Sequence, residues 1–276
     1  MPTSRLREVR VDTPLGELHV RLHGEGTPVV MWPAVFVDST TWDRVLPLLQ
    51  AEADATPRRF VLVDPPGHGR SDPLRRTTDI EGAANAAAVL IDTIAPDQPV
   101  DWVGNAFGGH VGFALAQDPG RLRSLIAISS PVDPISPGQR CASEILSGLL
   151  RATGPVGPAQ SAILSILLTE TSRANGSIRR VVTDAVHRPS RASISRAVRS
   201  FILNRRDVSD ELGRIVVPSL HIASDERKDW GPQDASRAAE LCPGGRAVTI
   251  QGARTLIPLE RPRELADAVK EFWEAL

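Results

Sequence analysis

The residues from Gly104 to Gly108 read Gly-Asn-Ala-Phe-Gly and directly follow the apolar stretch 100–103. This is the G-x-S-x-G spacing and the strand–turn–helix setting of a nucleophile elbow, with alanine where the serine belongs. Such an elbow holds a reactive hydroxyl on a sharp turn at the carboxyl end of a strand. Because a methyl group cannot attack a substrate, Ala106 marks a nucleophile position without a nucleophile.

The segments around this motif predict an α/β fold. Short apolar runs alternate with helical patterns along the chain. The runs cover 29–32, 60–63, 100–103, 125–128, 220–223 and 247–250. Near-continuous apolar strands are typical of a parallel sheet with helices on both faces. Alternating residues at 6–11 and 18–22 predict an antiparallel hairpin ahead of that sheet.

The regular alternation stops between about residues 134 and 214, where the pattern is helical throughout. We expect two parts: an α/β core formed by 1–133 and 215–276, and a helical cap inserted at 134–214. A helix capped by Thr78 or Asp79 and a last helix over about 262–275 belong to the core. An insertion at this point of the chain lies where a cap would cover the mouth of an active site.

Three motifs in this order resemble those of the α/β-hydrolase family. Residues 64–72 (Asp-Pro-Pro-Gly-His-Gly-Arg-Ser-Asp) resemble the D-x-P-G-x-G-x-S turn, and 259–262 (Leu-Glu-Arg-Pro) resemble the segment after the catalytic histidine. Residues 104–110 are most similar to the G-N-S-x-G-G elbow of carbon–carbon bond hydrolases acting on ring-cleavage products. The resemblance covers essentially the whole chain. It implies a mostly parallel eight-stranded sheet flanked by helices, with a helical cap.

The resemblance also assigns the positions of a catalytic triad, which follow the order nucleophile, acid, histidine. The nucleophile position is Ala106, and the histidine position is Thr255. The last histidine of the chain is His221, on a predicted strand. A triad needs a hydroxyl or thiol to attack and an imidazole to remove its proton, so the ordinary serine-hydrolase mechanism is excluded.

The acid of the family usually lies in the loop after the seventh strand, here 224–229. Carboxylates are present there at Asp225, Glu226 and Asp229, but the best-aligned position falls on Glu226 or Arg227. Without the imidazole, a carboxylate at this place has nothing to orient.

Backbone donors do not depend on side chains, so an oxyanion hole can survive these replacements. The resemblance places one donor at the Phe107 amide and the second near Ala34, in the loop 32–36. Trp32 and Pro33 stand where the family usually has His-Gly. We expect the pocket to be lined by Trp32, Ala34, Val35, Phe36 and Phe107.

Other candidates for acid–base or binding roles are Asp38, Asp133 and His187, and each has a plainer alternative. Asp38 suits a turn or helix cap. Asp133 could replace the missing acid or simply belong to a turn. His187 stands among cap arginines, where a solvated surface is the alternative. His68 and His110 are expected to have structural roles.

The net charge of −1 and a pI of about 6.6 give no reason to expect a nucleic-acid partner. No segment is apolar enough to span a membrane, and no signal peptide is recognisable, so we expect a cytoplasmic protein. Cys141 and Cys242 lack metal or redox spacing, so no metal or other cofactor is expected. The expected partner is a small molecule, and the oligomeric state stays open.

Four functional hypotheses remain. The first is a non-hydrolytic enzyme of cyclase, lyase or isomerase type, using an oxyanion hole and an apolar pocket on a small carbonyl compound. The second is a small-molecule binding protein without catalysis. The third is an ester or carbon–carbon bond hydrolase in which alanine was introduced for a native serine at 106, which leaves Thr255 unexplained. The fourth is a hydrolase whose water is activated by a carboxylate such as Asp38.

Overall fold

The sheet that carries the elbow has eight strands in the order β1-β2-β4-β3-β5-β6-β7-β8 in the computed structural model, which describes residues 7–51 and 57–276. Strand β2 pairs antiparallel with β1 and β4, and every pairing from β4 to β8 is parallel. Leu6 of the predicted hairpin and the amino-terminal residues before it lie outside the described residues. The strands are β1 (Arg7–Val11), β2 (Leu18–His23), β3 (Thr27–Trp32), β4 (Arg58–Val63), β5 (Val100–Asn105), β6 (Leu122–Ile128), β7 (Ser219–Ser224) and β8 (Gly245–Ile250).

Two apolar cores lie on opposite faces of this sheet, because alternate residues of each parallel strand point to opposite faces. In β3, Val30 and Trp32 belong to one core, while Val29 and Met31 belong to the other. Helices α2, α3 and α9 contribute to the first core, and α1 and α11 to the second. The core helices are η1 (Ser39–Trp42), α1 (Leu46–Gln50), α2 (Ile80–Ile94), α3 (Phe107–Leu115), α9 (Pro232–Leu241), α10 (Ile257–Glu260) and α11 (Pro262–Glu274).

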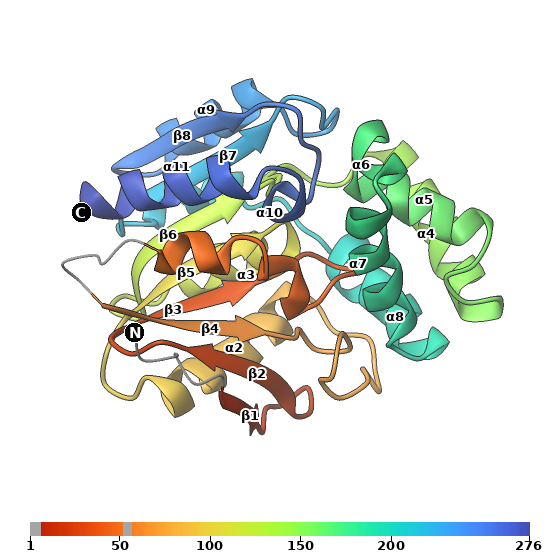
Figure 1. Ribbon diagram of the computed structural model, residues 1–276, viewed down its shortest axis with the longest axis horizontal. Coiled ribbons are helices and arrows are strands. Elements are labelled where there is room, and N and C mark those ends of the chain that lie inside the picture. The colour runs from red at the N-terminus through yellow and green to blue at the C-terminus, as the bar shows by residue number, and fades with distance from the viewer. Residues whose placement is uncertain (1–6, 52–56) are drawn as a thin grey trace.

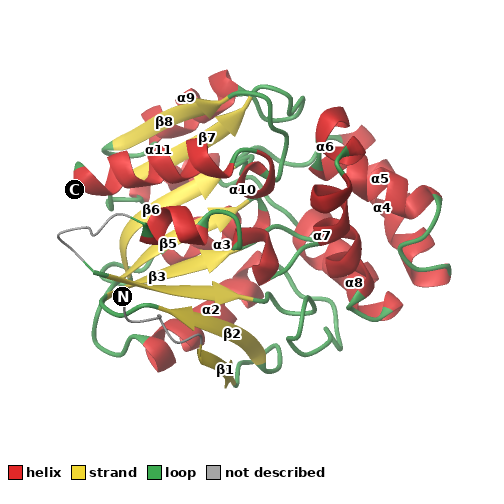
Figure 2. Cartoon of the chain, viewed as in Figure 1, coloured by secondary structure: helices red, strands yellow, loops and turns green. Residues whose placement is uncertain are grey.

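The chain between β6 and β7 is helical (Figure 2). Its helices gather beyond the carboxyl ends of the strands (Figure 1). We call this segment, with its predicted bounds 134–214, the helical insertion. It contains α4 (Pro137–Ala152), α5 (Pro158–Leu167), α6 (Glu170–Ala174), α7 (Gly176–His187), α8 (Arg191–Val198), the π-helical turn η2 (Arg199–Leu203) and the 3-10 turn η3 (Ser209–Arg214).

Local sequence signals explain where several helices begin. Asp79 caps α2 by accepting a hydrogen bond from the Gly82 amide, as predicted. Ser136 and Gln139 form a capping box at the start of α4. Within the described ranges, no helix has the length and apolar character needed to cross a membrane.

Candidate active site

The turn at Ala106 has the backbone geometry of an elbow. Ala106 follows β5 directly, has φ 48° and ψ −103°, and is the N-cap of α3. A positive φ is uncommon for a residue other than glycine, and such strain is held in place by the surrounding structure. Here a Cβ at Gly104 would lie 2.2 Å from the Gly108 backbone, and a Cβ at Gly108 would lie 2.1 Å from the Trp32 carbonyl oxygen. Glycine is therefore required at both positions for the elbow to pack.

Trp32 packs against the elbow from within the apolar core. Its side chain is fully buried, stacks on Trp102 at 5.5 Å between ring centroids and meets the edge of Phe107 at 6.2 Å. We expected Trp32 to line the pocket, but the structure places it in the core, because the last residue of β3 points into that face of the sheet.

The loop after β3 is held in an unusual conformation. Phe36 has φ 76°, and its amide donates to Nε2 of His68 over 3.2 Å. Nδ1 of the same imidazole donates to the Pro66 carbonyl over 3.1 Å. Burial lowers the pKa of His68, so its ring is neutral and can accept at one nitrogen while donating at the other. His68 thus ties the loop to the glycine turn, as its expected structural role requires.

A cavity of about 460 Å³ opens above the elbow, between the core and the helical insertion. Ala106, Thr255 and the expected pocket residues Ala34, Val35, Phe36 and Phe107 all line it. Apolar side chains of the insertion complete its wall, namely Ile135, Leu146, Ile166, Leu167, Phe201 and Ile202. This size and lining fit a small apolar ligand.

Ala34 and Phe107, whose amides are the expected oxyanion-hole donors, both line this cavity. Among the described residues, neither amide donates a hydrogen bond to another protein group. Phe107 N also begins α3, so it lies at the positive end of the helix dipole. Phe107 is fixed by its ring, which stacks on Phe201 of the helical insertion at 4.1 Å between centroids.

Thr255 occupies its place through two hydrogen bonds. Its Oγ1 donates to the Ile166 carbonyl over 2.9 Å, and its own carbonyl accepts from Nδ2 of Asn105 over 2.9 Å. The loop after β8 is therefore fastened both to the helical insertion and to the end of the elbow strand. The hydroxyl is engaged with a carbonyl group, so Thr255 acts here as a positioning residue of the wall.

Arg227 reaches the cavity from the loop after β7, whereas Asp225 and Glu226 of the same loop are exposed and do not line it. The Asp225 carboxylate accepts from the Gly252 amide over 2.7 Å. Arg227 donates from Nε and Nη2 to both oxygens of Asp229, over 2.9 and 3.1 Å. The Asp229 carboxylate is thereby paired within the cavity wall.

The pKa of Asp229 is lowered, because the raising effect of burial is outweighed by Arg227. Gln139 of α4 adds a further hydrogen bond of 3.0 Å to this carboxylate. A carboxylate with a lowered pKa and donors on both oxygens is a weak proton acceptor. Asp229 therefore has a structural role in the cavity wall.

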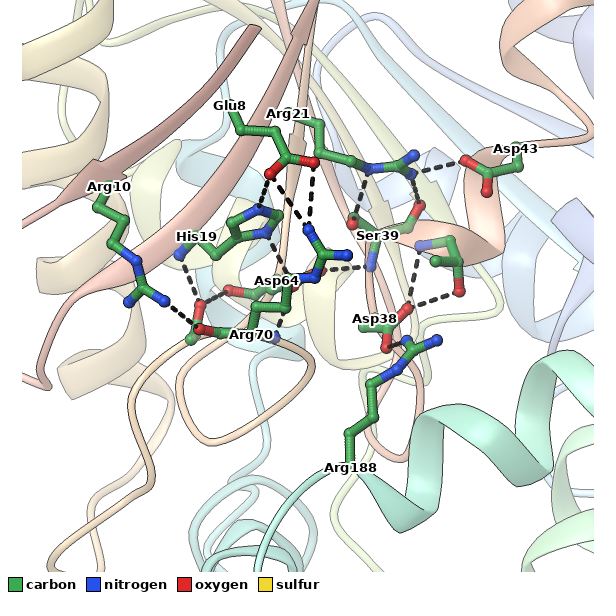
Figure 3. A network of polar contacts seen from close by, with 12 residues as sticks. Glu8, Arg10, His19, Arg21, Asp38, Ser39, Asp43, Asp64, Arg70 and Arg188 are labelled. Atoms are coloured by element: carbon green, nitrogen blue, oxygen red, sulfur yellow. Dashed lines mark hydrogen bonds and ion pairs between the residues drawn. The ribbon is translucent and has the colours of Figure 1, made fainter. Parts of the chain in front are cut away.

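Asp38 joins the core to the helical insertion and does not line the cavity. Its carboxylate caps η1 by accepting from the Thr40 amide over 3.0 Å and pairs with Arg188 (Figure 3). The side chain is almost completely buried. The structure thus places Asp38 in the helix-cap position that the sequence allowed, outside the cavity lining.

Asp133 and His187 also lie outside the cavity lining. Asp133 is half-exposed and forms an ion pair of 2.6 Å with Arg237 of α9. His187 is exposed at the end of α7, where its Nδ1 donates to the Thr183 carbonyl over 2.7 Å. Asp133 is therefore paired at the surface, and His187 faces solvent.

Several lining residues did not figure among the sequence candidates, among them the charged or titratable side chains His110, Arg205, Arg227, Lys228 and Arg254. The sequence did point to Arg227, because the position of the family's catalytic acid aligns with Glu226 or Arg227. His110 lies on α3, its side chain is 4% exposed, and its Nδ1 has no hydrogen-bond partner. Burial, with Arg205 and Arg227 nearby, holds the pKa of His110 well below its usual range. Its imidazole is therefore neutral.

Comparison with known proteins shows the family to which the chain belongs. A profile of the Alpha/beta hydrolase family matches residues 22–268, so the chain belongs to that family. None of the curated proteins compared with the chain matches it.

Solved structures with the same fold cover almost the whole chain. A thermophilic esterase from Thermogutta terrifontis superposes with a TM-score of 0.84 at 22% identity, over 98% of each chain. The enol-lactonase from Burkholderia xenovorans LB400 gives a TM-score of 0.85 at 20% identity, over 96% of this chain and 100% of the other. A bromoperoxidase from Bacillus anthracis gives 0.80 at 16% identity, over 97% and 100%. At these identities the likeness establishes the fold.

Proposed function

We propose that the protein is a non-hydrolytic enzyme, of lyase, isomerase or cyclase type, acting on a small apolar carbonyl compound. The observation that carries this proposal lies at the elbow. The Ala106 methyl group stands where the family has its nucleophile, beside a cavity at which the Ala34 and Phe107 amides have no protein acceptor. In this proposal the helical insertion serves as the cap that encloses the substrate.

Two such amides stabilise negative charge on a carbonyl oxygen, as an oxyanion hole does. In a hydrolase that charge arises when the nucleophile attacks the carbonyl carbon. Here the electron pair of a carbon–carbon or carbon–hydrogen bond next to the carbonyl moves onto the carbonyl oxygen, so the species bound by the amides is an enolate, and solvent water carries the proton that is released or taken up. One well-placed donor contributes about 2.7–4 kcal/mol to the stabilisation of such a transition state.

The lining also favours reactions within one bound molecule over transfer to water. The apolar wall orients a small substrate, and orientation alone lowers barriers of cyclisation or elimination substantially. Asp229, the carboxylate at the cavity, is held by Arg227 and Gln139, which makes it unsuited to activating a water molecule.

The same pairing of Asp229 supports a second candidate function, a binding protein that returns its ligand unchanged. The two functions differ in one measurable outcome. A compound that raises the melting temperature and is recovered chemically intact supports the binding protein, whereas conversion of that compound supports the enzyme.

The test is proton NMR in D2O on a panel of small apolar ketones, thioesters and β-keto esters. We expect accelerated exchange at the carbon next to the carbonyl, or rearrangement, without release of an alcohol or thiol. Ala106→Leu should abolish this activity by filling the cavity floor, while Ala174→Leu on the exposed surface of α6 serves as the matched control. The melting temperature of each variant is measured as well, so that a loss of activity can be distinguished from a loss of folding. Release of alcohol or thiol above the buffer rate would contradict a non-hydrolytic reaction.

A further inference from the structure

Arg205 is a cationic side chain that lines the cavity. It follows η2, where the helical insertion returns to the core, and it is only partly exposed. Its guanidinium makes no hydrogen bond or ion pair with the described residues, and its Nε is buried without a partner. A guanidinium withdrawn from water and left unpaired is costly, so an anion bound beside it gains most of its interaction energy there.

The groups that act electrostatically on Arg205 are a second arginine, Arg227, and the carboxylates of Asp229 and Asp133. Burial, and then repulsion from Arg227, lowers the pKa of Arg205 to about 10, which leaves it protonated at neutral pH. Arg227 is balanced by its ion pair with Asp229. His110, neutral and with an unpartnered Nδ1, lies close to both arginines and lines the same cavity. Arg205 therefore stands at the cavity without a directly bonded carboxylate, and the basic side chains of Lys228 and Arg254 line the same cavity.

We infer that the cavity binds a carboxylate beside Arg205, with Arg227 and His110 as neighbours, so that the ligand is a small, otherwise apolar carboxylic acid in its ionised form. The inference rests on the proposed function only in treating this ligand as the substrate. A planar guanidinium fork matches a carboxylate in shape and charge, and charge-assisted hydrogen bonds of this kind are the stronger ones.

The position of His110 also limits the distance between the two ends of the ligand. His110 follows Ala106 by four residues on α3, and its amide donates to the Ala106 carbonyl over 3.2 Å. One helical turn rises about 5.4 Å, so the backbone of His110 lies about that far along the helix axis from the elbow residue. The ligand that fits is an acid whose carbonyl group is a few bonds from its carboxylate. Its apolar part lies against the stacked pair Phe107 and Phe201.

Calorimetric titration with matched probes tests this inference without any turnover. The probes are phenylacetate, 3-phenylpropanoate and 4-phenylbutanoate, each against its neutral amide. We expect the best-fitting acid to bind about 10- to 100-fold more tightly than its amide. Arg205→Gln should remove this preference, while Arg206→Gln, at an exposed position paired with Glu81, should keep it.

Four outcomes would overturn the inference: equal affinity for acid and amide, no binding of any probe, loss of the preference in Arg254→Gln instead of Arg205→Gln, or stronger binding of phenyl phosphate. Failure of the proposed function would give a different result from failure of the carboxylate site. If acids bind in an Arg205-dependent manner but no carbonyl compound is converted, the carboxylate site stands and the enzyme proposal fails. If Arg205→Gln converts a neutral substrate as well as the unchanged protein does, the enzyme proposal stands and the carboxylate site fails.

Discussion

Ala106→Ser alone is expected to give no esterase activity above that of the unchanged protein. The new hydroxyl would stand on the elbow facing the cavity, but an imidazole must remove its proton. His110 lines the cavity, yet the depressed pKa of its buried ring makes it a poor base. In a serine protease of another fold, removing the histidine costs about a million-fold, or roughly 8 kcal/mol of transition-state stabilisation.

The matched triple variant Ala106→Ser/Arg227→Asp/Thr255→His restores the acid and histidine positions as well. Thr255→His places an imidazole on a loop whose backbone is already held by Asn105, at the loss of one hydrogen bond to Ile166. Arg227→Asp supplies the acid at the position that faces the cavity. Because a misplacement of about 1 Å costs about a hundred-fold, we expect the triple variant to exceed the single one by about 10²- to 10⁴-fold.

The assay is release of p-nitrophenolate from short-chain p-nitrophenyl esters, with the melting temperature of each variant as the folding control. Strong activity of Ala106→Ser alone would refute the reasoning. It would show that an existing group, His110 first of all, can act as the base. Loss of that activity in the double variant Ala106→Ser/His110→Gln would then identify it.

Three further predictions concern stability. Gly108→Ala should destabilise the protein by about 1–3 kcal/mol in urea unfolding, because its Cβ would meet the Trp32 carbonyl oxygen at 2.1 Å; an unchanged midpoint would contradict the tight elbow packing. Arg188→Gln, which leaves its buried partner carboxylate unpaired, should cost about 1 kcal/mol by the same measurement, since Arg188 itself is 41% exposed. Burial raises the pKa of Asp64, but hydrogen bonds led by that from His19 outweigh it and lower it from 3.8 to about 2. Asp64 therefore contributes about 2 kcal/mol above pH 4 that is lost as the pH falls toward 2. His19, whose pKa the Asp64 hydrogen bond raises, contributes stability below pH 6.5 that is lost as the pH rises through its folded pKa. In unfolding experiments from pH 2 to 8, Asp64→Asn should remove both the loss of stability at low pH and the loss at high pH. Persistence of either loss would contradict the contribution of the His19–Asp64 pair.

Much of the fold could be predicted from the sequence. The apolar runs at 29–32 and 100–103 fall within β3 and β5, and the predicted last helix over about 262–275 is α11, Pro262–Glu274. The eight-stranded, mostly parallel sheet is confirmed. Apolar periodicity and capping residues act over a few neighbouring positions, so they are visible in the chain itself.

The candidate site was predicted less completely. The elbow and the loop after β3 meet at the cavity as expected, but Asp38, Asp133 and His187 lie elsewhere. Their position along the chain put them near the mouth of the site, yet side-chain direction and a nearby ion-pair partner determine where each one points. Asp38 found such a partner in Arg188, from a distant part of the chain.

The sequence by itself determined what Ala106 and Thr255 can do, because the chemistry of a side chain is a property of its residue type. No fold can supply a hydroxyl at Ala106 or an imidazole at Thr255. Only the tertiary structure brought Arg205, from the end of the helical insertion, to Arg227 and to His110 on the elbow helix. Contacts between such distant residues depend on how the sheet, the insertion and the loops pack, and no local pattern encodes them.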